Sequence, residues 1–473
     1  MKPSTGIPFS SIVFDSKDDT PRYRQLYAYI RDMILNGSLT AGVHLPSSRE
    51  LAAEIGVSRN TVIAAYELLV DEQFAESAVG RGTVVRPVPL LGRSGSPCEP
   101  TTPRDMCSAP LRMGFALPDT DHFPSPTWQK VLRAVVKRAE PAVARPPVEG
   151  IVRLRRLVSA YLGAYRGVRC REEQVLITGG GQQALYLAAR VLREISGQIY
   201  IEDPGYVGAR QAFEACGFEL RPLPVDDDGI QPGEILHSPA GGPKAVYLTP
   251  SHQFPLGSVL SLERRLQILN WAGECGGWII EDDYDAEYRY DGEPLTALAG
   301  LDDSERVIYV GTFSKVLSPE LRLGYLVVPE ALLERFRSVK GFCDGASPVL
   351  TQNAVADFIQ DGYFQAHLRQ MRTLYRGKRD LFLQTLRECQ VPVTVQTRPH
   401  GMHITLKLDG QKRDLDIARQ MMARGFEVPA LSKHYLRTEQ VLQGLLVGFT
   451  NAREEDCRDF AENLLEIMEC TES

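Results

Sequence analysis

A lysine, two hydroxyl side chains and an arginine follow one apolar run in the middle of this sequence. Residues 307–311 are apolar, Thr312, Ser314 and Lys315 come directly after them, and Arg322 follows seven residues later. A lysine amine can form a Schiff base with an aldehyde, and hydroxyls with a guanidinium can hold a phosphate. Pyridoxal phosphate (PLP) carries both groups, so this spacing predicts a PLP site.

A second apolar run, residues 278–280, leads into carboxylates and a tyrosine. A carboxylate keeps the pyridine nitrogen of PLP protonated, and a tyrosine hydroxyl can contact its phenolic oxygen. Because side chains alternate along a strand, Asp282 and Asp283 point to opposite faces. We favour Asp282, with Tyr284 two residues on, as the partner of the cofactor.

Two upstream turns could complete such a site. Residues 179–182, Gly-Gly-Gly-Gln, join a predicted strand to a predicted helix, where backbone N–H groups suit a phosphate. Tyr206 follows the next predicted strand and offers a ring to stack on the pyridine. Each motif alone is more often structural than functional, and His252, in a later loop, is more often a structural histidine than a catalyst. Their order along the chain favours one site, because the carboxyl ends of strands in an open α/β sheet meet at one edge.

Residues 12–86 have the pattern of a winged helix-turn-helix (α+β). Apolar residues at helical spacing predict a first helix, Ser47 and Glu50 have capping-box spacing before a second, and Ser58 begins a third. A glycine-tipped β-ribbon at 79–85 supplies the wing. The polar residues that could reach bases or phosphates are Arg49, Ser58, Arg59, Asn60, Thr61 and Arg81. A winged helix used only for protein contacts is the alternative.

Charge and composition limit the classes of function. The formal net charge is −7, and residues 1–86 hold nine basic and ten acidic residues, so any contact with DNA must be local. Nine scattered cysteines without C-x-x-C spacing suit a reduced compartment, and no metal site is predicted. The sequence has neither a signal core nor a membrane span, which predicts a cytoplasmic protein without a membrane partner.

The chain has 473 residues, which is more than one domain usually holds. Residues 87–110 are rich in proline, glycine and serine and predict a linker. From residue 111, strand-like runs alternate with helical stretches, which predicts an α/β domain with a mostly parallel sheet covered by helices on both faces. We expect this large domain over 111–340 and a small α+β subdomain over 341–473.

The motifs together resemble a known family. Residues 20–86 resemble the GntR-type winged helix, and residues 111–470 resemble fold-type I PLP enzymes of the aspartate aminotransferase superfamily. Joined by a linker, they resemble the MocR/GabR subfamily of bacterial transcription regulators. The resemblance implies a head-to-tail homodimer on a double-stranded DNA operator, with Gly82 letting the wing approach the DNA backbone.

The same resemblance implies roles in the cofactor site. Lys315 is expected to form the internal aldimine with PLP, Asp282 to hold the pyridine nitrogen, Tyr284 to contact the ring oxygen and Tyr206 to stack on the ring. The residues implied around the phosphate are Gly181, Gln182, Thr312, Ser314 and Arg322. Arg210 matches an arginine that binds the effector carboxylate, and Lys433 lies near the position of a second one.

One departure from active aminotransferases affects the expected function. Phe254 stands where those enzymes commonly place an asparagine beside the ring oxygen, so efficient turnover is not expected. We expect a regulator, not an enzyme, with residual half-transamination at most. It would sense an amino compound, or PLP itself, through aldimine formation, and control genes of amino-compound or vitamin B6 metabolism. The alternative is an aminotransferase with an accessory DNA-binding head.

Overall fold

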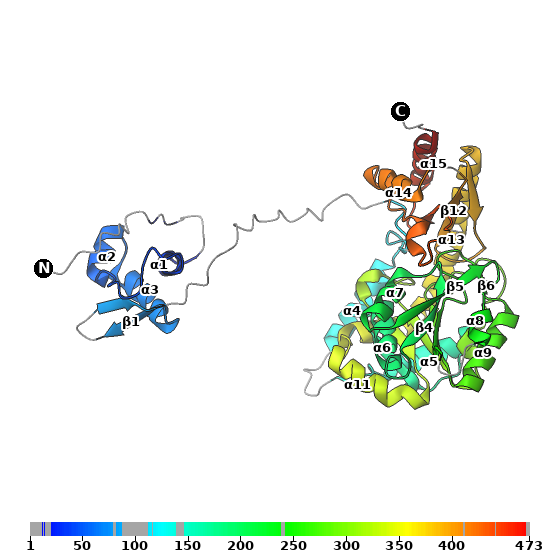
Figure 1. Cartoon of the computed structure of the whole chain (residues 1–473), viewed down its shortest axis with the longest axis horizontal. Coiled ribbons are helices and arrows are strands. Elements are labelled where there is room, and N and C mark those ends of the chain that lie inside the picture. The colour runs from blue at the N-terminus through cyan, green and yellow to red at the C-terminus, as the bar shows by residue number, and fades with distance from the viewer. Residues whose placement is uncertain are drawn as a thin grey trace. The chain divides into compact units, whose positions relative to one another are not determined.

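The computed structural model describes residues 12, 14, 20–78, 82–87, 112–115, 117–138, 146–237, 242–409, 412–439 and 441–469. The chain separates into two compact units, residues 1–106 and 107–473, which are described one at a time (Figure 1). Most of the predicted linker and the tip of the predicted wing, including Arg81, lie outside the described residues.

The first unit is a three-helix bundle with a two-stranded ribbon. Its elements are α1 (Arg22–Leu35), α2 (Ser48–Ile55), α3 (Arg59–Asp71), β1 (Ala75–Ala78) and β2 (Gly82–Val85). The ribbon is antiparallel, with Ala75 opposite Val85. Leu26, Leu51 and Leu69, one from each helix, are fully buried in a shared core. Burial of these apolar side chains holds the three helices together.

Local polar signals define the helix-turn-helix of this unit. The Ser47 hydroxyl accepts from the Glu50 N–H, and the Glu50 carboxylate accepts from the Ser47 N–H, which confirms the predicted capping box. Gly56 ends α2 with a φ of 69°, a left-handed conformation that glycine adopts without a steric cost. Ser58 then accepts from the Thr61 N–H and begins α3.

The second unit is built on an eight-stranded sheet with the order β3-β10-β9-β8-β7-β4-β5-β6. The strands are β3 (Val175–Thr178), β4 (Gln198–Asp203), β5 (Glu219–Asp226), β6 (Gly229–Ile230), β7 (Ala245–Leu248), β8 (Trp278–Asp283), β9 (Val307–Thr312) and β10 (Gly324–Val327). The pairs between β9 and β5 are parallel, whereas β10 and β6 are antiparallel to their neighbours. The predicted mostly parallel sheet is confirmed.

Helices cover both faces of this sheet. Along β3, Val175 and Ile177 belong to one apolar core and Leu176 to another, so alternate residues point into different layers. The helices are α4 (Ser125–Arg138), α5 (Val152–Arg166), α6 (Gly181–Leu192), α7 (Val207–Ala215), α8 (Gly233–Leu236), α9 (Leu262–Cys275), α10 (Leu298–Leu301), α11 (Leu333–Cys343) and α12 (Val349–Gln360). Among the described residues, every helix is too short or too polar to span a bilayer.

A smaller α+β part follows. It contains α13 (Tyr363–Glu388), β11 (Val393–Gln396), β12 (His403–Leu408), α14 (Asp414–Ala423), β13 (Gly444–Gly448) and α15 (Glu454–Glu469). Its three strands form an antiparallel sheet of order β11-β12-β13. In Figure 1, α14, α15 and β12 lie together at one end of the unit. Strand β5 is not predicted from the sequence. It contains Pro222 and Pro224, and proline argues against a strand except at the edge of a sheet.

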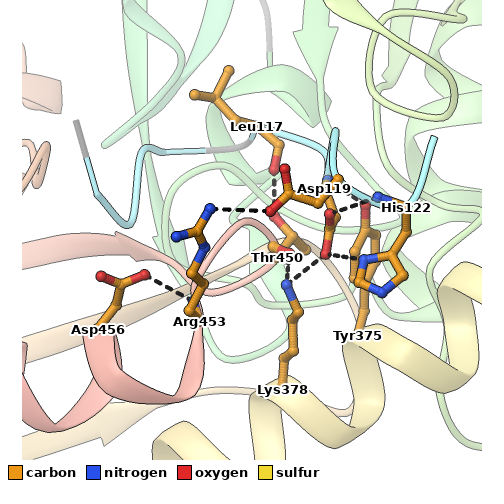
Figure 2. A network of polar contacts seen from close by, with 9 residues as sticks. Leu117, Asp119, His122, Tyr375, Lys378, Thr450, Arg453 and Asp456 are labelled. Atoms are coloured by element: carbon orange, nitrogen blue, oxygen red, sulfur yellow. Dashed lines mark hydrogen bonds and ion pairs between the residues drawn. The ribbon is translucent and has the colours of Figure 1, made fainter. Parts of the chain in front are cut away.

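The boundary between the large and small parts near residue 340 stays a prediction. Helix α12 packs on the large part, where the Phe358 ring meets the Trp128 ring edge-on at 5.7 Å. Residues 112–115 and 117–119, in contrast, attach to the small part, and Figure 2 shows the contacts of Leu117 and Asp119. The Asp119 carboxylate pairs with Lys378 at 2.6 Å, and the Lys378 ammonium also donates to the Thr450 carbonyl at 2.9 Å. A pocket of about 460 Å³ borders this network.

Candidate functional site

Lys315 lies in the turn that follows β9. The turn is fixed by its backbone, since the Phe313 N–H donates to the Leu323 carbonyl at 3.0 Å. The Tyr288 hydroxyl donates to the carbonyl oxygen of Lys315 at 3.2 Å. Burial lowers the pKa of the Lys315 amine, against the opposing charges of nearby Asp285 and Asp282. A lowered pKa makes the unprotonated, nucleophilic form of the amine more accessible.

The two aspartates at the end of β8 have different surroundings, as strand alternation predicts. Asp282 is buried and accepts a hydrogen bond from the Tyr247 hydroxyl at 2.8 Å. Burial raises the pKa of Asp282 to about 7, although this hydrogen bond opposes the shift. Asp283 is paired instead with buried Arg166 at 2.8 Å. Asp283 therefore already has a cationic partner, and of these two aspartates it is Asp282 whose charge acts on Lys315.

The N-terminus of α6 lies beside the lysine turn. The first N–H groups of a helix have no partner within the helix, so they can bind a phosphate. A Cβ on Gly181 would meet no atom within 4 Å, and a Cβ on Gly180 would lie 3.9 Å from the Ser314 hydroxyl oxygen. A Cβ on Gly179 would lie 4.0 Å from the Arg322 carbonyl. Gly180 and Gly181 leave room for an anion, whereas the Gly179 N–H already donates to the Gln183 side chain at 2.6 Å, so the residues at the start of α6 fit the phosphate of PLP.

Gln182, a predicted phosphate contact, and Tyr206, the predicted stacking ring, lie together near the start of α7. The Gln182 side chain donates to the Gly208 carbonyl at 2.8 Å, and the Tyr206 hydroxyl lies 3.4 Å from the Gln182 side-chain oxygen. Gly208 allows this arrangement, because a Cβ there would lie 2.5 Å from the Tyr206 ring. The Thr312 hydroxyl accepts from the Ser314 N–H at 3.1 Å. It is therefore engaged in the lysine turn.

Phe254 lies inside a cluster of rings. Its side chain is 4% exposed and meets the rings of Tyr206 at 5.5 Å and Tyr284 at 6.1 Å, both edge-on. The ring of His434 meets it in the same way at 5.1 Å. Because a phenylalanine has no hydrogen-bond donor, this side of the site lacks the amide that Asn would supply.

The sequence does not predict three buried polar residues of the site, Glu202, Asp285 and His403, and it favours only a structural role for His252. Glu202 is the penultimate residue of β4, and its carboxylate accepts from the Thr249 N–H at 3.2 Å. Burial raises the pKa of Glu202 to about 8. His252, Asp285 and His403 are also buried, and their potential ligand atoms lie within 4.8 Å of one another. A carboxylate at a strand end was a usable signal for Glu202. No comparable sequence signal predicts that His403, on the three-stranded sheet, lies against His252.

The predicted effector residues are brought to one region. Arg210, on α7, donates to the Tyr435 carbonyl at 3.5 Å. Burial lowers the pKa of His434 to about 4, and the charges of Arg210 and Lys433 contribute to this shift. Both cations therefore lie near the same imidazole. Lys433 is exposed, whereas Arg210 is half-buried and lines a small cavity with Glu202.

The predicted DNA-reading residues divide into two groups. Arg49 on α2 is exposed, as are Arg59 and Asn60 at the start of α3. The Arg59 guanidinium donates to the Ser48 hydroxyl at 3.2 Å. Ser58 and Thr61 bond to each other through their hydroxyls at 2.8 Å and form the helix cap. Gly82 has a φ of 79° with open space around it. Arg81 lies outside the described residues.

Comparison with known proteins accounts for both units. Residues 22–85 match the family "Bacterial regulatory proteins, gntR family", and residues 113–442 match "Aminotransferase class I and II". The chain is 35% identical to "Probable rhizopine catabolism regulatory protein MocR" of Rhizobium meliloti, over 98% of this chain and 97% of that protein. It is 32% identical to "HTH-type pyridoxine biosynthesis transcriptional regulator PdxR" of Corynebacterium glutamicum, over 94% and 96%.

Solved structures resemble the second unit. The kynurenine aminotransferase of Pyrococcus horikoshii aligns with a TM-score of 0.69 and 27% identity, over 77% of this chain and 93% of the enzyme. These matches confirm the predicted fold type I architecture and the predicted family. The similarity to regulators spans nearly the whole chain, whereas the similarity to enzymes stops at the second unit. The chain therefore belongs to the MocR-type helix-turn-helix transcriptional regulators, in which a GntR-family segment is joined to an aminotransferase class I and II segment.

Proposed function

We propose that this regulator binds PLP and uses it to sense a small amino compound, or PLP itself. The observation that carries the proposal is the meeting of Lys315, Asp282 and the N-terminus of α6 at one edge of the sheet. When bound, PLP supplies an aldehyde that reacts with amines and a ring that withdraws electrons. Because the chain also carries a GntR segment, binding of such a ligand can change its affinity for DNA.

Each side chain would have a separate task. Lys315 would hold the cofactor covalently, and Asp282 would hold a proton at the pyridine nitrogen. Tyr284 would contact the ring oxygen, and Tyr206 would pack on the ring. The phosphate would lie among Gly181, Gln182, Thr312, Ser314 and Arg322. With its pKa near 7, Asp282 would ionise fully only beside a cation, so a protonated pyridine would stabilise its charged form.

The effector is proposed to be an amino compound with an acidic group. Arg210 would bind its carboxylate, because it lies near the site and a guanidinium binds carboxylates through two parallel hydrogen bonds. Lys433 would add a second positive charge near the imidazole of His434, to which Arg210 is also close. The names of two relatives mention rhizopine catabolism and pyridoxine biosynthesis, which supports control of genes for amino-compound or vitamin B6 metabolism.

Sensing rather than turnover is favoured by Phe254. A ring in place of an amide donor removes a hydrogen bond that helps set protonation of the cofactor, while Lys315 remains able to bind it. Residual half-transamination is compatible with this arrangement. The alternative, an aminotransferase with an accessory DNA-binding head, draws support from the enzymes that share the fold. Steady-state product formation with a 2-oxo acid distinguishes the two.

The output is proposed to be DNA binding by a head-to-tail homodimer in the cytoplasm. Arg49, Arg59 and Asn60 would contact a double-stranded operator, and Arg81 and Gly82 would bring the wing to the DNA backbone. A coupling free energy of about 1–3 kcal/mol between effector and operator is enough to change occupancy several-fold to about a hundredfold.

The experiment measures operator affinity of the full chain with and without PLP, and then with candidate amino compounds. A visible absorbance band upon PLP addition, together with a ligand-dependent change in operator affinity, would support the proposal. A protein that forms no covalent PLP adduct would contradict it. So would an operator affinity that never responds to PLP or to any amino compound that changes the absorbance.

A further inference from the structure

A buried group of polar residues stands behind Tyr284. His252, Asp285, His400 and His403 are 5%, 1%, 7% and 3% exposed, so all four are removed from solvent. The Nδ1 atom of His252 lies 3.0 and 2.8 Å from the two carboxylate oxygens of Asp285. The same Nδ1 lies 3.2 Å from the hydroxyl oxygen of Tyr284. One imidazole nitrogen therefore faces a carboxylate and a phenol at once.

These contacts decide where the protons are. Burial raises the pKa of Asp285 to about 7, whereas the Met402 N–H, which donates to a carboxylate oxygen of Asp285 at 3.2 Å, opposes this shift, so the carboxylate is ionised above about pH 7. An ionised carboxylate only accepts, so the hydrogen of the neutral His252 ring belongs on Nδ1. The hydroxyl oxygen of Tyr284 can then only accept a hydrogen bond from this N–H. The proton of Tyr284 itself is then free for a different acceptor.

The ring of His252 cannot turn away from this position. A Cβ on Gly401 would lie 1.8 Å from its Cε1 atom, so only glycine fits there. The ring of His403 stacks on His252 with a centroid distance of 5.0 Å, and His400 meets it edge-on at 4.6 Å. Packing from the small part of the unit thus fixes the plane of the imidazole, and with it the direction of Nδ1.

A metal ion is a poorer explanation of the group. The potential ligand atoms of His252, Asp285 and His403 are close enough to share one. However, Arg166 and Arg289 line the cavity next to His252, and two guanidinium groups disfavour a divalent cation. The Nδ1 atom of His252 is, in addition, already engaged by Asp285. The contacts of His252 with Asp285 and Tyr284 are hydrogen bonds that need no ion.

We propose that His252 and Asp285 are positioning residues that turn the hydroxyl proton of Tyr284 toward the ring oxygen of PLP. The inference rests on the proposed function, because it assigns a donor to that oxygen. It also bears on the hydrogen bond that is lost because residue 254 is Phe and not Asn. Without that amide, the Tyr284 hydroxyl is the principal donor to the ring oxygen, so the direction of its proton decides whether the oxygen receives a hydrogen bond.

The test is the pH dependence of the visible absorbance of the PLP-loaded protein. Its midpoint reports a proton held between the lysine nitrogen and the ring oxygen of the cofactor. A hydrogen bond donated to the oxygen stabilises the proton-free form, so its loss raises the midpoint. The other charged and titratable groups around Tyr284 and Asp285 are Glu202, Asp282, Asp283, Arg166, Arg289, Lys315, His400 and His403.

Four substitutions separate positioning from packing. Tyr284→Phe removes the donor and should raise the midpoint by about one pH unit, a tenfold change in the equilibrium. His252→Leu should raise it comparably, and His252→Asn, which keeps an N–H near Nδ1, should raise it less. His400→Leu is the matched control, because leucine keeps an apolar side chain packed against His252 and removes an imidazole that makes no hydrogen bond to Tyr284 or Asp285. It should leave the midpoint unchanged.

The double variant Tyr284→Phe with His252→Leu should shift the midpoint no further than Tyr284→Phe alone, since both changes remove one hydrogen bond. His252→Phe provides a second route if His252→Leu does not fold, because it keeps a ring in the packed position and removes both ring nitrogens, and it should also raise the midpoint. An unchanged midpoint in His252→Leu or His252→Phe, or additive shifts in the double variant, would overturn the inference alone. Stoichiometric metal in the purified protein would do so too. Failure of the unsubstituted protein to bind PLP would overturn the proposed function first.

Discussion

The hydroxyl of Tyr288 donates a hydrogen bond to the backbone carbonyl oxygen of Lys315, and its ring meets that of Tyr375 at 4.9 Å. The hydroxyl of Tyr375 in turn accepts from the Asp119 N–H at 2.8 Å (Figure 2). Both tyrosines are fully buried. A continuous line of contacts therefore joins the lysine turn to the segment that follows the predicted linker.

Tyr288→Phe should weaken the response of the operator to the effector. It removes the hydroxyl contact to the lysine turn but keeps the ring, so we expect coupling to fall by about 0.5–2 kcal/mol with PLP still bound. Operator affinity with and without effector measures the change. Tyr200→Phe is the control, because its buried hydroxyl donates to the Glu234 carbonyl, away from this turn. Equal losses in both variants would contradict the coupling role.

Lys315→Ala should abolish covalent attachment of PLP while leaving the fold largely intact. The amine is the only part of the side chain that can react with the aldehyde, and alanine retains the backbone of the turn. Visible absorbance and borohydride reduction followed by mass spectrometry report the attachment. A reduced PLP adduct on the same turn of the variant would show that another residue holds the cofactor.

Arg59→Ala should weaken operator binding by about 1–3 kcal/mol if the guanidinium reads a base. The PLP absorbance should not change, because Arg59 and Lys315 belong to separate units. Gel-shift titrations over a series of salt concentrations measure the effect. Arg31→Ala offers a matched loss of charge on α1, where Arg31 pairs with Asp32. Equal weakening by both substitutions would indicate a general charge effect rather than a contact of the recognition helix.

The PLP-free protein should lose stability as the pH rises toward about 8. Burial raises the pKa of Glu202 from 4.5 to about 8, so the folded state binds more protons than the unfolded state between these values. Unfolding free energy should thus fall over that range, where Asp282 and Asp285 act in the same direction. Glu202→Gln should make the dependence shallower in thermal denaturation. A steeper dependence in this variant would contradict the assignment.

Phe254→Asn should increase the rate of half-transamination. The amide restores a donor where the natural side chain has none, and we expect the unsubstituted protein to stay below the ordinary enzyme range of about 1–1000 per second. Stopped-flow absorbance with amino acids, and product formation with a 2-oxo acid, measure the two rates. Enzyme-like steady-state turnover by the unsubstituted protein would favour the aminotransferase alternative instead.

The sequence by itself determined the features that depend on neighbouring residues. The capping box of Ser47 and Glu50 needs only residues three apart, and the opposite surroundings of Asp282 and Asp283 follow from strand alternation. The convergence of Lys315 with the α6 glycines was predictable too, because parallel strands end at one edge. The individual site roles stay predictions.

Only the tertiary structure decided the contacts between distant segments. His403 reaches His252 from the small sheet, and Tyr375 links Asp119 to Tyr288 across α13. Such contacts depend on how whole elements pack, and a buried histidine or tyrosine has the same local sequence signal whether it supports a core or a site. The residues that surround Tyr284 are therefore determined by packing between distant segments and not by a local sequence motif.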